Sequence, residues 1–181
     1  MKKACSDFLG SAFWILLASL VLFGLAVGLH GTAVANTQAE YMRIMQTLLP
    51  GSGSFTVEPY TGEDESIRSV HKGENGFVVE AVTRGYADEL TMLVGVSNDG
   101  SVTGLVVKDL HETMGLGGNA LTDREFLAQF LRTGGDAEVG GNVDALTGAT
   151  VTSKAVARCV NSAVAVVTGA DAGSSATSWG G

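Results

Sequence analysis

The sequence predicts an α+β fold, a mostly antiparallel sheet flanked by helices and preceded by one N-terminal transmembrane helix. Runs of Val, Leu, Ile and Phe recur between Gly, Asn and Asp breaks, which is the pattern of short strands joined by turns. Two later segments space their apolar residues three and four apart, as amphipathic helices do. Strands that follow one another through short turns pair antiparallel, and the helices lie in separate stretches, so the class is α+β.

The N-terminal transmembrane helix is predicted for residues 11–31. From Ser11 to Leu29 the chain carries no charged residue, and as a helix this stretch is about 28 Å long, close to the ~30 Å of a bilayer core. The small residues Ala33-Val34-Ala35 also resemble a secretory cleavage site, so a cleaved signal is the alternative. We favour the retained anchor because the apolar run exceeds the roughly 7 to 15 residues of a signal core.

The charge distribution predicts the orientation in the cell (inner) membrane. Lys2 and Lys3 precede the anchor, which places residues 1–10 in the cytoplasm by the positive-inside tendency. The rest of the chain has 9 basic residues (11 minus Lys2 and Lys3) and 18 acidic residues (19 minus Asp7), a net charge of −9. We therefore expect the soluble part outside the cytoplasm, and its acidity argues against nucleic-acid binding.

After the anchor, residues 32–65 are expected to form a helix and a linker. The helix is predicted over Ala39–Leu49, and Pro50-Gly51 ends it. Asn98-Asp99-Gly100 is expected to be a hairpin turn, in which Gly100 can adopt a positive φ. The predicted strands cover residues 66–70, 76–83, 91–97 and 102–107.

Two helices are predicted after the strands. The first covers Thr122–Leu131, and Asp123 suits its first turn. The second covers residues 153–167, with Thr152 or Ser153 as its N-cap and Gly169 as its end. Residues 66–168 would form one domain, and the Ser-, Gly- and Ala-rich tail, residues 169–181, is expected to be disordered.

The sequence gives no sign of a metal or disulfide framework. It has no CxxC pattern, and its histidines are His30, His71 and His111. Cys5 precedes the predicted span and Cys159 follows it, so the two thiols would lie on opposite sides of the membrane and could not pair.

The most informative stretch is the turn before the second helix. Small residues let a ligand approach the backbone, hydroxyls can bond it, and the helix start offers unpaired amides and the positive end of a dipole. Together these features suit a held phosphate. Taken alone, they also fit a turn followed by a helix cap, and Asp144 fits either a brace for the turn or a positioning role. The residues concerned are Asp144, Thr147, Gly148, Ala149, Thr150, Thr152 and Ser153.

The glycine-rich loop His111–Gly118 is the second informative segment. A zinc-protease helix is excluded because Gly115 stands where the second His is required. A dinucleotide fingerprint fits loosely, but no helix opens directly at the loop and the neighbouring strands are expected to be antiparallel. Taken alone, the loop fits a simple chain reversal, with His111 as a packed or hydrogen-bonded side chain.

Taken together, the two segments resemble the FMN-binding domain family. Val143 to Thr150, followed by Val-Thr-Ser, resembles the family's flavinylation motif, and His111 to Gly117 resembles its companion loop, with Met114 where Pro is usual. Arg84-Gly85-Tyr86 and the strand pair after it are similar to the segment that precedes this loop. The N-terminal helix followed by Leu48-Leu49-Pro50-Gly51 is similar to the G subunit of Rnf electron-transport complexes; the C subunit of the sodium-translocating NADH:quinone reductase is a more distant relative.

The resemblance implies a role for each matching residue. Thr150 would carry FMN through a phosphoester bond, made outside the cytoplasm by a separate flavin transferase. Thr147, Gly148 and Ala149 would line the phosphate. Amides or hydroxyls would be added by Thr152 and Ser153, and the flavin ring would be contacted by Glu112, Thr113, Leu116 and Gly117.

The function implied is that of an electron-carrier subunit with covalent FMN. It would belong to a membrane-bound Rnf-type complex that couples ferredoxin:NAD oxidoreduction to sodium or proton translocation. The sequence shows no nicotinamide site, no iron-sulfur ligands and no ion path through several helices, so other membrane and peripheral subunits would perform those tasks. The alternatives are a free-standing membrane-anchored flavoprotein for extracellular electron transfer and a non-redox anchored scaffold module.

Overall fold

The computed structural model describes residues 17–24, 38–85, 89–109, 123–131 and 133–169. The chain divides into two compact units, Met1–Arg43 and Ile44–Gly181. In the first unit residues 17–24 are helical, and the rest of the predicted anchor lies outside the described residues. Among the described residues, no helix combines the length and the apolar character that crossing a membrane requires.

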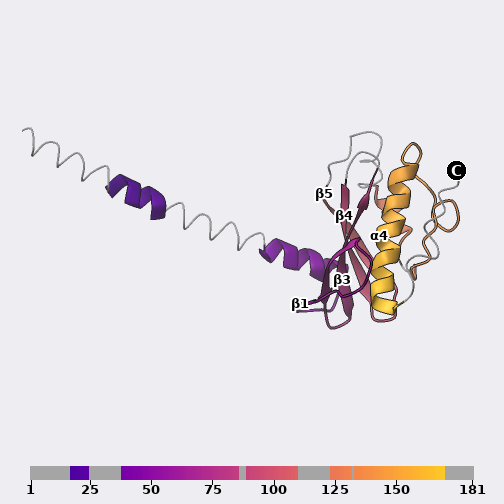
Figure 1. Cartoon of the computed structure of the whole chain (residues 1–181), viewed down its shortest axis with the longest axis horizontal. Coiled ribbons are helices and arrows are strands. Elements are labelled where there is room, and N and C mark those ends of the chain that lie inside the picture. The colour runs from indigo at the N-terminus through magenta and orange to yellow at the C-terminus, as the bar shows by residue number, and fades with distance from the viewer. Residues whose placement is uncertain (1–16, 25–37, 86–88, 110–122, 132, 170–181) are drawn as a thin grey trace, which may run out of the picture. The chain divides into compact units, whose positions relative to one another are not determined.

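The second unit is built on an antiparallel sheet, with α4 (Thr150–Thr168) packed beside it (Figure 1). The sheet has five strands, which lie side by side in chain order. The antiparallel α+β class predicted from the sequence is confirmed. The strands are β1 (Thr56–Glu58), β2 (Ile67–Lys72), β3 (Gly76–Arg84), β4 (Glu89–Ser97) and β5 (Val102–Asp109).

Strand β1 was not predicted, and its composition explains why. It has three residues, none of them buried, and it pairs with β2 through its backbone, Val57 opposite His71. A strand that buries no side chain shows no alternation of apolar and polar residues.

The turn between β4 and β5 has the predicted geometry. Gly100 adopts φ +85°, and Ser97 N donates to Ser101 O at 2.9 Å. The Asp99 carboxylate accepts from Ser97 Oγ and, at 3.0 Å, from Ser101 N. The turn is therefore held by its own side chains.

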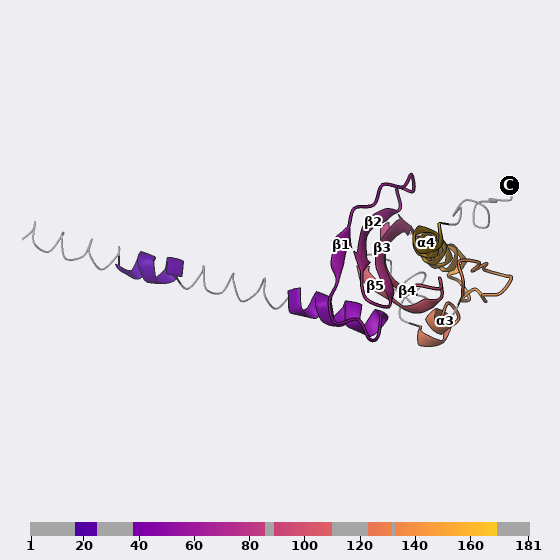
Figure 2. The ribbon, with the colours of Figure 1, turned by 90° about the horizontal axis from the view of Figure 1, so that it is seen from below.

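Two helices, α3 (Arg124–Ala128) and α4 (Thr150–Thr168), lie on the same side of the sheet (Figure 2). Alternate residues of the central strands face them, because side chains of a strand point to opposite faces in turn. The rings of Phe126 and Phe130 pack edge to face, 5.3 Å between centroids. The core between sheet and helices includes Val79, Ala81, Met92, Val94, Val96, Phe126, Phe130, Val156, Val160 and Ala163.

The other face of the sheet receives the end of the helix over residues 38–48. This helix was predicted, as was its break at Pro50. Gly95 of β4 pairs with Gly104 of β5, and a Cβ atom at Gly95 would lie 2.3 Å from Leu48 O. Thr103 Oγ1 also donates to this carbonyl oxygen. The two glycines thus allow the backbone at Leu48 to lie directly on the sheet.

The boundaries of α3 and α4 differ from the predicted ones. Helix α4 begins at Thr150 with Ala149 as its N-cap, so the prediction of Thr152 or Ser153 as N-cap was wrong. Helix α3 is shorter than predicted, and Asp123 is its N-cap, accepting from Glu125 N and Phe126 N at 2.9 Å each. The predicted end of α4 is confirmed: Gly169 has φ +70°. Residues 170–181 lie outside the described residues.

Candidate functional site

The turn that precedes α4 is a tight one. Ala149 N donates to Leu146 O at 2.9 Å, which closes a four-residue turn with Thr147 and Gly148 at its centre. Gly148 has φ +78°, the value that the third residue of a type II turn needs and that glycine adopts without strain. A Cβ atom there would meet nothing within 4 Å. The glycine therefore serves the backbone conformation, and the space around it is open.

The first residues of α4 have unpaired amides. The N–H groups of Thr150, Val151 and Thr152 precede the first i→i−4 bond, which Ser153 N donates to Ala149 O at 2.8 Å. The N-cap, Ala149, supplies no side-chain hydrogen bond. Thr150 itself is exposed. An anion at this helix start would meet open N–H groups and the positive end of the helix dipole.

Ser153 braces the turn from inside. Its side chain is buried, its Oγ donates to Ala149 O at 2.9 Å, and Leu146 N donates to it at 3.3 Å. One hydroxyl therefore joins both ends of the turn to the first turn of the helix.

Thr152 lies in a different environment. It is fully buried, and its Oγ1 is one of two buried side-chain polar atoms among the described residues that have no hydrogen-bond partner; the other is Ser66 Oγ. In this conformation neither the hydroxyl nor the amide of Thr152 reaches the surface, so an incoming phosphate would meet neither of them. The sequence alone could not distinguish it from its exposed neighbours.

Three carboxamides hold the segment that leads into the turn. Asn161 of α4 donates to Ala137 O at 2.9 Å and accepts from Ala137 N at 3.0 Å, with both residues buried. Asn142 bonds Glu138 N and Asp136 O in the same two-point manner. Gln129 accepts from Asp144 N at 2.8 Å and donates to Asp144 O at 3.5 Å.

These contacts define the part that Asp144 plays in the structure. Its backbone is held by Gln129, while its side chain is exposed. Neither Gln129 nor Asn161 was predicted from the sequence to contribute to the site. A carboxamide among the apolar residues of α4, as at Asn161, is a signal that could have indicated such a contact.

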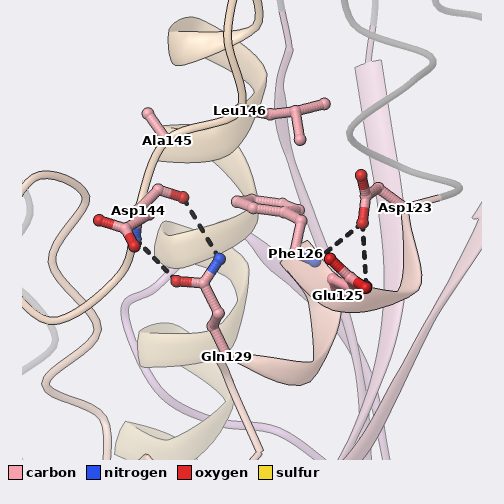
Figure 3. Close-up of a pocket in the computed structure, with 7 residues that line it drawn as sticks. All are labelled: Asp123, Glu125, Phe126, Gln129, Asp144, Ala145 and Leu146. Carbon is pink, nitrogen blue, oxygen red and sulfur yellow. Dashed lines mark hydrogen bonds between the residues drawn. The ribbon is translucent and has the colours of Figure 1, made fainter.

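An open pocket of about 320 Å³ lies beside the turn (Figure 3). Residues of α3 and of the segment before α4 form it, and Leu146 belongs both to the pocket wall and to the turn. In Figure 3 the ring of Phe126 lies between the start of α3 and the backbone of Asp144–Leu146. The lining residues are Asp123, Glu125, Phe126, Gln129, Asp144, Ala145 and Leu146.

The structure brings together part of the predicted site. Asp144, Thr147, Gly148, Ala149, Thr150, Thr152 and Ser153 all lie in or beside the turn. The other predicted contacts, Glu112, Thr113, Leu116 and Gly117, lie outside the described residues, as does His111. Among the described residues, Cys159 is the free cysteine; burial raises the pKa of its thiol to about 12, so it is no nucleophile at neutral pH.

An exposed threonine at an uncapped helix start, behind a glycine turn, is suited to hold the phosphate of a cofactor. A family model described as the FMN-binding domain matches residues 85–165, a range that includes this turn and most of α4. The match to this family model identifies residues 85–165 as an FMN-binding domain, as the sequence predicts.

Comparison with curated proteins identifies the family. A Methanosarcina acetivorans protein, named as the G subunit of an ion-translocating oxidoreductase complex, is 31% identical over 174 residues, which cover 83% of this chain and 91% of that protein. The G subunit of the proton-translocating ferredoxin:NAD(+) oxidoreductase complex of Clostridium ljungdahlii is 40% identical over 51% of this chain and 53% of its own length. The G subunit of the Na(+)-translocating complex of Acetobacterium woodii is 35% identical over 56% of each chain.

The chain belongs to the family of G subunits of ion-translocating oxidoreductase complexes. It spans about half the length of the Clostridium and Acetobacterium relatives that it matches.

Proposed function

We propose that this chain is an electron-carrier subunit that bears FMN covalently on Thr150, within an Rnf-type membrane complex that couples ferredoxin:NAD oxidoreduction to sodium or proton translocation. The observation that carries the proposal is the exposed Thr150 at the first position of α4, beside open amides. Bound FMN supplies reversible uptake and release of electrons. The protein's own part is to attach the cofactor, hold its phosphate and fix its position.

The phosphate would be held mainly by backbone groups. The Gly148 turn leaves space for it, and the amides of the exposed residues Thr150 and Val151 would face its charge. The helix dipole would add about 0.3–1 kcal/mol of stabilisation at a surface site of this kind. Thr147 and Ala149 would line the phosphate, and Ser153 would keep the turn in place.

The ring contacts and the topology remain proposals from the sequence. Glu112, Thr113, Leu116 and Gly117 would contact the flavin ring. The domain would lie outside the cytoplasm, behind a single N-terminal membrane span, where a flavin transferase attaches FMN. The other membrane and peripheral subunits of the complex would be its partners, which the names of the relatives support.

Purification in mild detergent tests the proposed membership of a complex. We expect an affinity-tagged chain, expressed in its own cells, to bring down further membrane subunits in constant proportion. A chain that purifies alone but carries flavin would instead support the free-standing flavoprotein. A chain that shows no fluorescent band on a denaturing gel would support the scaffold without cofactor.

A further inference from the structure

We propose that Lys154 is the cationic partner of the phosphate that joins FMN to Thr150, with its ammonium group paired to the free oxygens of the phosphodiester. This inference rests on the proposed function, because it takes the attachment at Thr150 as its starting point. It gives a positioning role to a residue that was not predicted from the sequence to belong to the site.

The exposure of the first two turns of α4 is the first argument. Along residues 150–157 the side chains of Thr150, Val151 and Lys154 are exposed, and the others are buried. The outer side of the helix start therefore consists of the attachment hydroxyl, one apolar side chain and one cation. A phosphate on Thr150 would lie on this side, because the buried side of the helix packs into the core.

The helical spacing is the second argument. Lys154 follows Thr150 by four residues, and the Cβ atoms of residues four apart lie about 5–6 Å from each other on one side of a helix. Side chains of a helix also point back toward its N-terminus, so a long side chain covers the turn that precedes its own Cα atom. The ammonium group of Lys154 can therefore reach a phosphate on Thr150 without any change in the helix.

The charges around the turn are the third argument. Between residues 144 and 153 the one charged side chain is that of Asp144, which is exposed and would repel a phosphate. Lys154 is the first cation after it. Among the residues that the structure describes, no ion pair includes Lys154, so its charge is available to an incoming anion.

Arg158 is the other cation on the same row of the helix. Its Cα atom lies about 12 Å along the helix axis from that of Thr150, whereas the Cα atom of Lys154 lies about 6 Å away. Screening by salt acts over ~8 Å at physiological ionic strength, which weakens the attraction of the more distant cation. The contact with the phosphate is therefore assigned to Lys154.

The phosphorus NMR resonance of the attached phosphate is the direct test, because a cation in contact with a phosphodiester changes the shielding of its phosphorus atom. The full chain is co-expressed with a flavin transferase and purified in detergent, and its intact mass establishes that one FMN is present. We expect the resonance to move in Lys154→Gln. We expect it to stay near the wild-type position in Lys154→Arg, which keeps the positive charge.

A salt titration of the wild type needs no variant. Between ~0.01 M and ~1 M salt the Debye length falls from about 30 Å to about 3 Å, so an exposed ion pair is progressively screened. We expect the wild-type resonance to move toward that of Lys154→Gln as salt is added, and the resonance of Lys154→Gln to stay where it is. This measurement decides the question if Lys154→Gln is not loaded with FMN.

Lys72→Gln is the control for net charge. Lys72 is exposed and pairs with Phe77, which pairs with Val96 close to the Gly100 turn. A Cβ atom at Gly100 would lie 2.6 Å from the side chain of Thr168, so this turn lies at the far end of α4 from the attachment site. We expect Lys72→Gln to leave both the phosphorus resonance and its response to salt unchanged.

The free energy of unfolding provides an independent measurement. An exposed ion pair between residues four apart on a helix changes the unfolding equilibrium constant about two-fold. Urea denaturation in detergent should show this change for Lys154→Gln in the chain that carries FMN, and no change when Lys154→Gln is combined with Thr150→Val, which leaves no phosphate to pair with. Any effect of glutamine on the helix itself is the same in both backgrounds and cancels.

The outcomes separate this inference from the proposed function. One FMN on Thr150 of the wild type, with a phosphorus resonance that neither salt nor Lys154→Gln moves, would overturn the role of Lys154 and leave the attachment standing. Equal movements in Lys154→Gln and Lys72→Gln would also overturn it, because the effect would follow net charge rather than contact. A wild-type chain without FMN, or with FMN on another residue, would overturn both.

Discussion

Three hydroxyl residues within four positions, Thr150, Thr152 and Ser153, lie in three different environments. Thr150 is exposed, Ser153 is buried with two hydrogen bonds, and Thr152 is buried with none. Only the first can receive a new covalent bond without rearrangement of the helix. Their environments therefore support distinct roles, although the three look alike in the sequence.

Thr152→Val tests the cost of the unpaired hydroxyl. A buried hydroxyl without a hydrogen bond costs roughly 1–3 kcal/mol, and valine has a similar shape, so we expect the free energy of unfolding of the FMN-free chain to rise by about 1 kcal/mol or more. Urea denaturation in detergent measures it. A fall in stability would mean that the Thr152 hydroxyl has a partner in solution.

The buried thiol of Cys159 makes the stability of the domain depend on pH. Burial raises the pKa of its thiol from 9.0 to about 12, so the folded state keeps the proton that the unfolded chain loses. Because the pKa is higher in the folded state, the contribution of this thiol to the free energy of unfolding is fully present below pH 9. It declines as the pH rises from 9 towards 12. Between pH 8 and pH 10 we expect the free energy of unfolding of the wild type to fall by about 1 kcal/mol more than that of Cys159→Ala, as measured by urea denaturation at each pH. Equal losses in the two proteins would contradict burial of this thiol.

At the scale of elements, α4 serves two purposes. Its N-terminus forms the proposed attachment site, and its buried face packs on β3 and β4 and holds the segment 136–144 through Asn161. The position of the turn relative to the sheet therefore depends on contacts made two turns or more along the helix.

Asn161→Ala tests this connection. The change leaves the buried N–H and C=O groups of Ala137 unpaired, at about 1–3 kcal/mol each, so we expect unfolding to become easier by about 2–4 kcal/mol. Asn142→Ala is the matched control, because it breaks two similar bonds at exposed backbone groups that water can satisfy. We expect the free energy of unfolding of this control to fall by about 1 kcal/mol or less. Similar losses of stability in the two variants would contradict a special role of Asn161 in holding the segment 136–144.

The elements differ in how far the sequence could predict them. Strands β2 to β5 and the Gly100 turn follow from local patterns, because each buries side chains or needs a glycine. The start of α4 was placed too late because Thr152 and Ser153 are good capping residues, whereas Ala149 is a poor one. The pocket depends on Gln129 meeting Asp144, fifteen residues away, and no local pattern encodes that contact.

At the scale of the whole domain, the sheet supports the helices, and the proposed cofactor site lies at one end of it. Two helices cover one face, and the turn before α4, the start of α3 and the pocket between them come together at their junction. The family match over residues 85–165 covers this junction. In the proposed function, such an arrangement would present the cofactor at the surface, where electrons would reach neighbouring subunits.

The attachment of FMN to Thr150 is the central claim, and intact mass measures it most directly. The full chain and its Thr150→Val variant are each co-expressed with a flavin transferase, and their masses are compared. We predict one FMN on the wild type and none on the variant. A variant that retains the FMN, on Thr147, Thr152 or any other residue, would contradict the account.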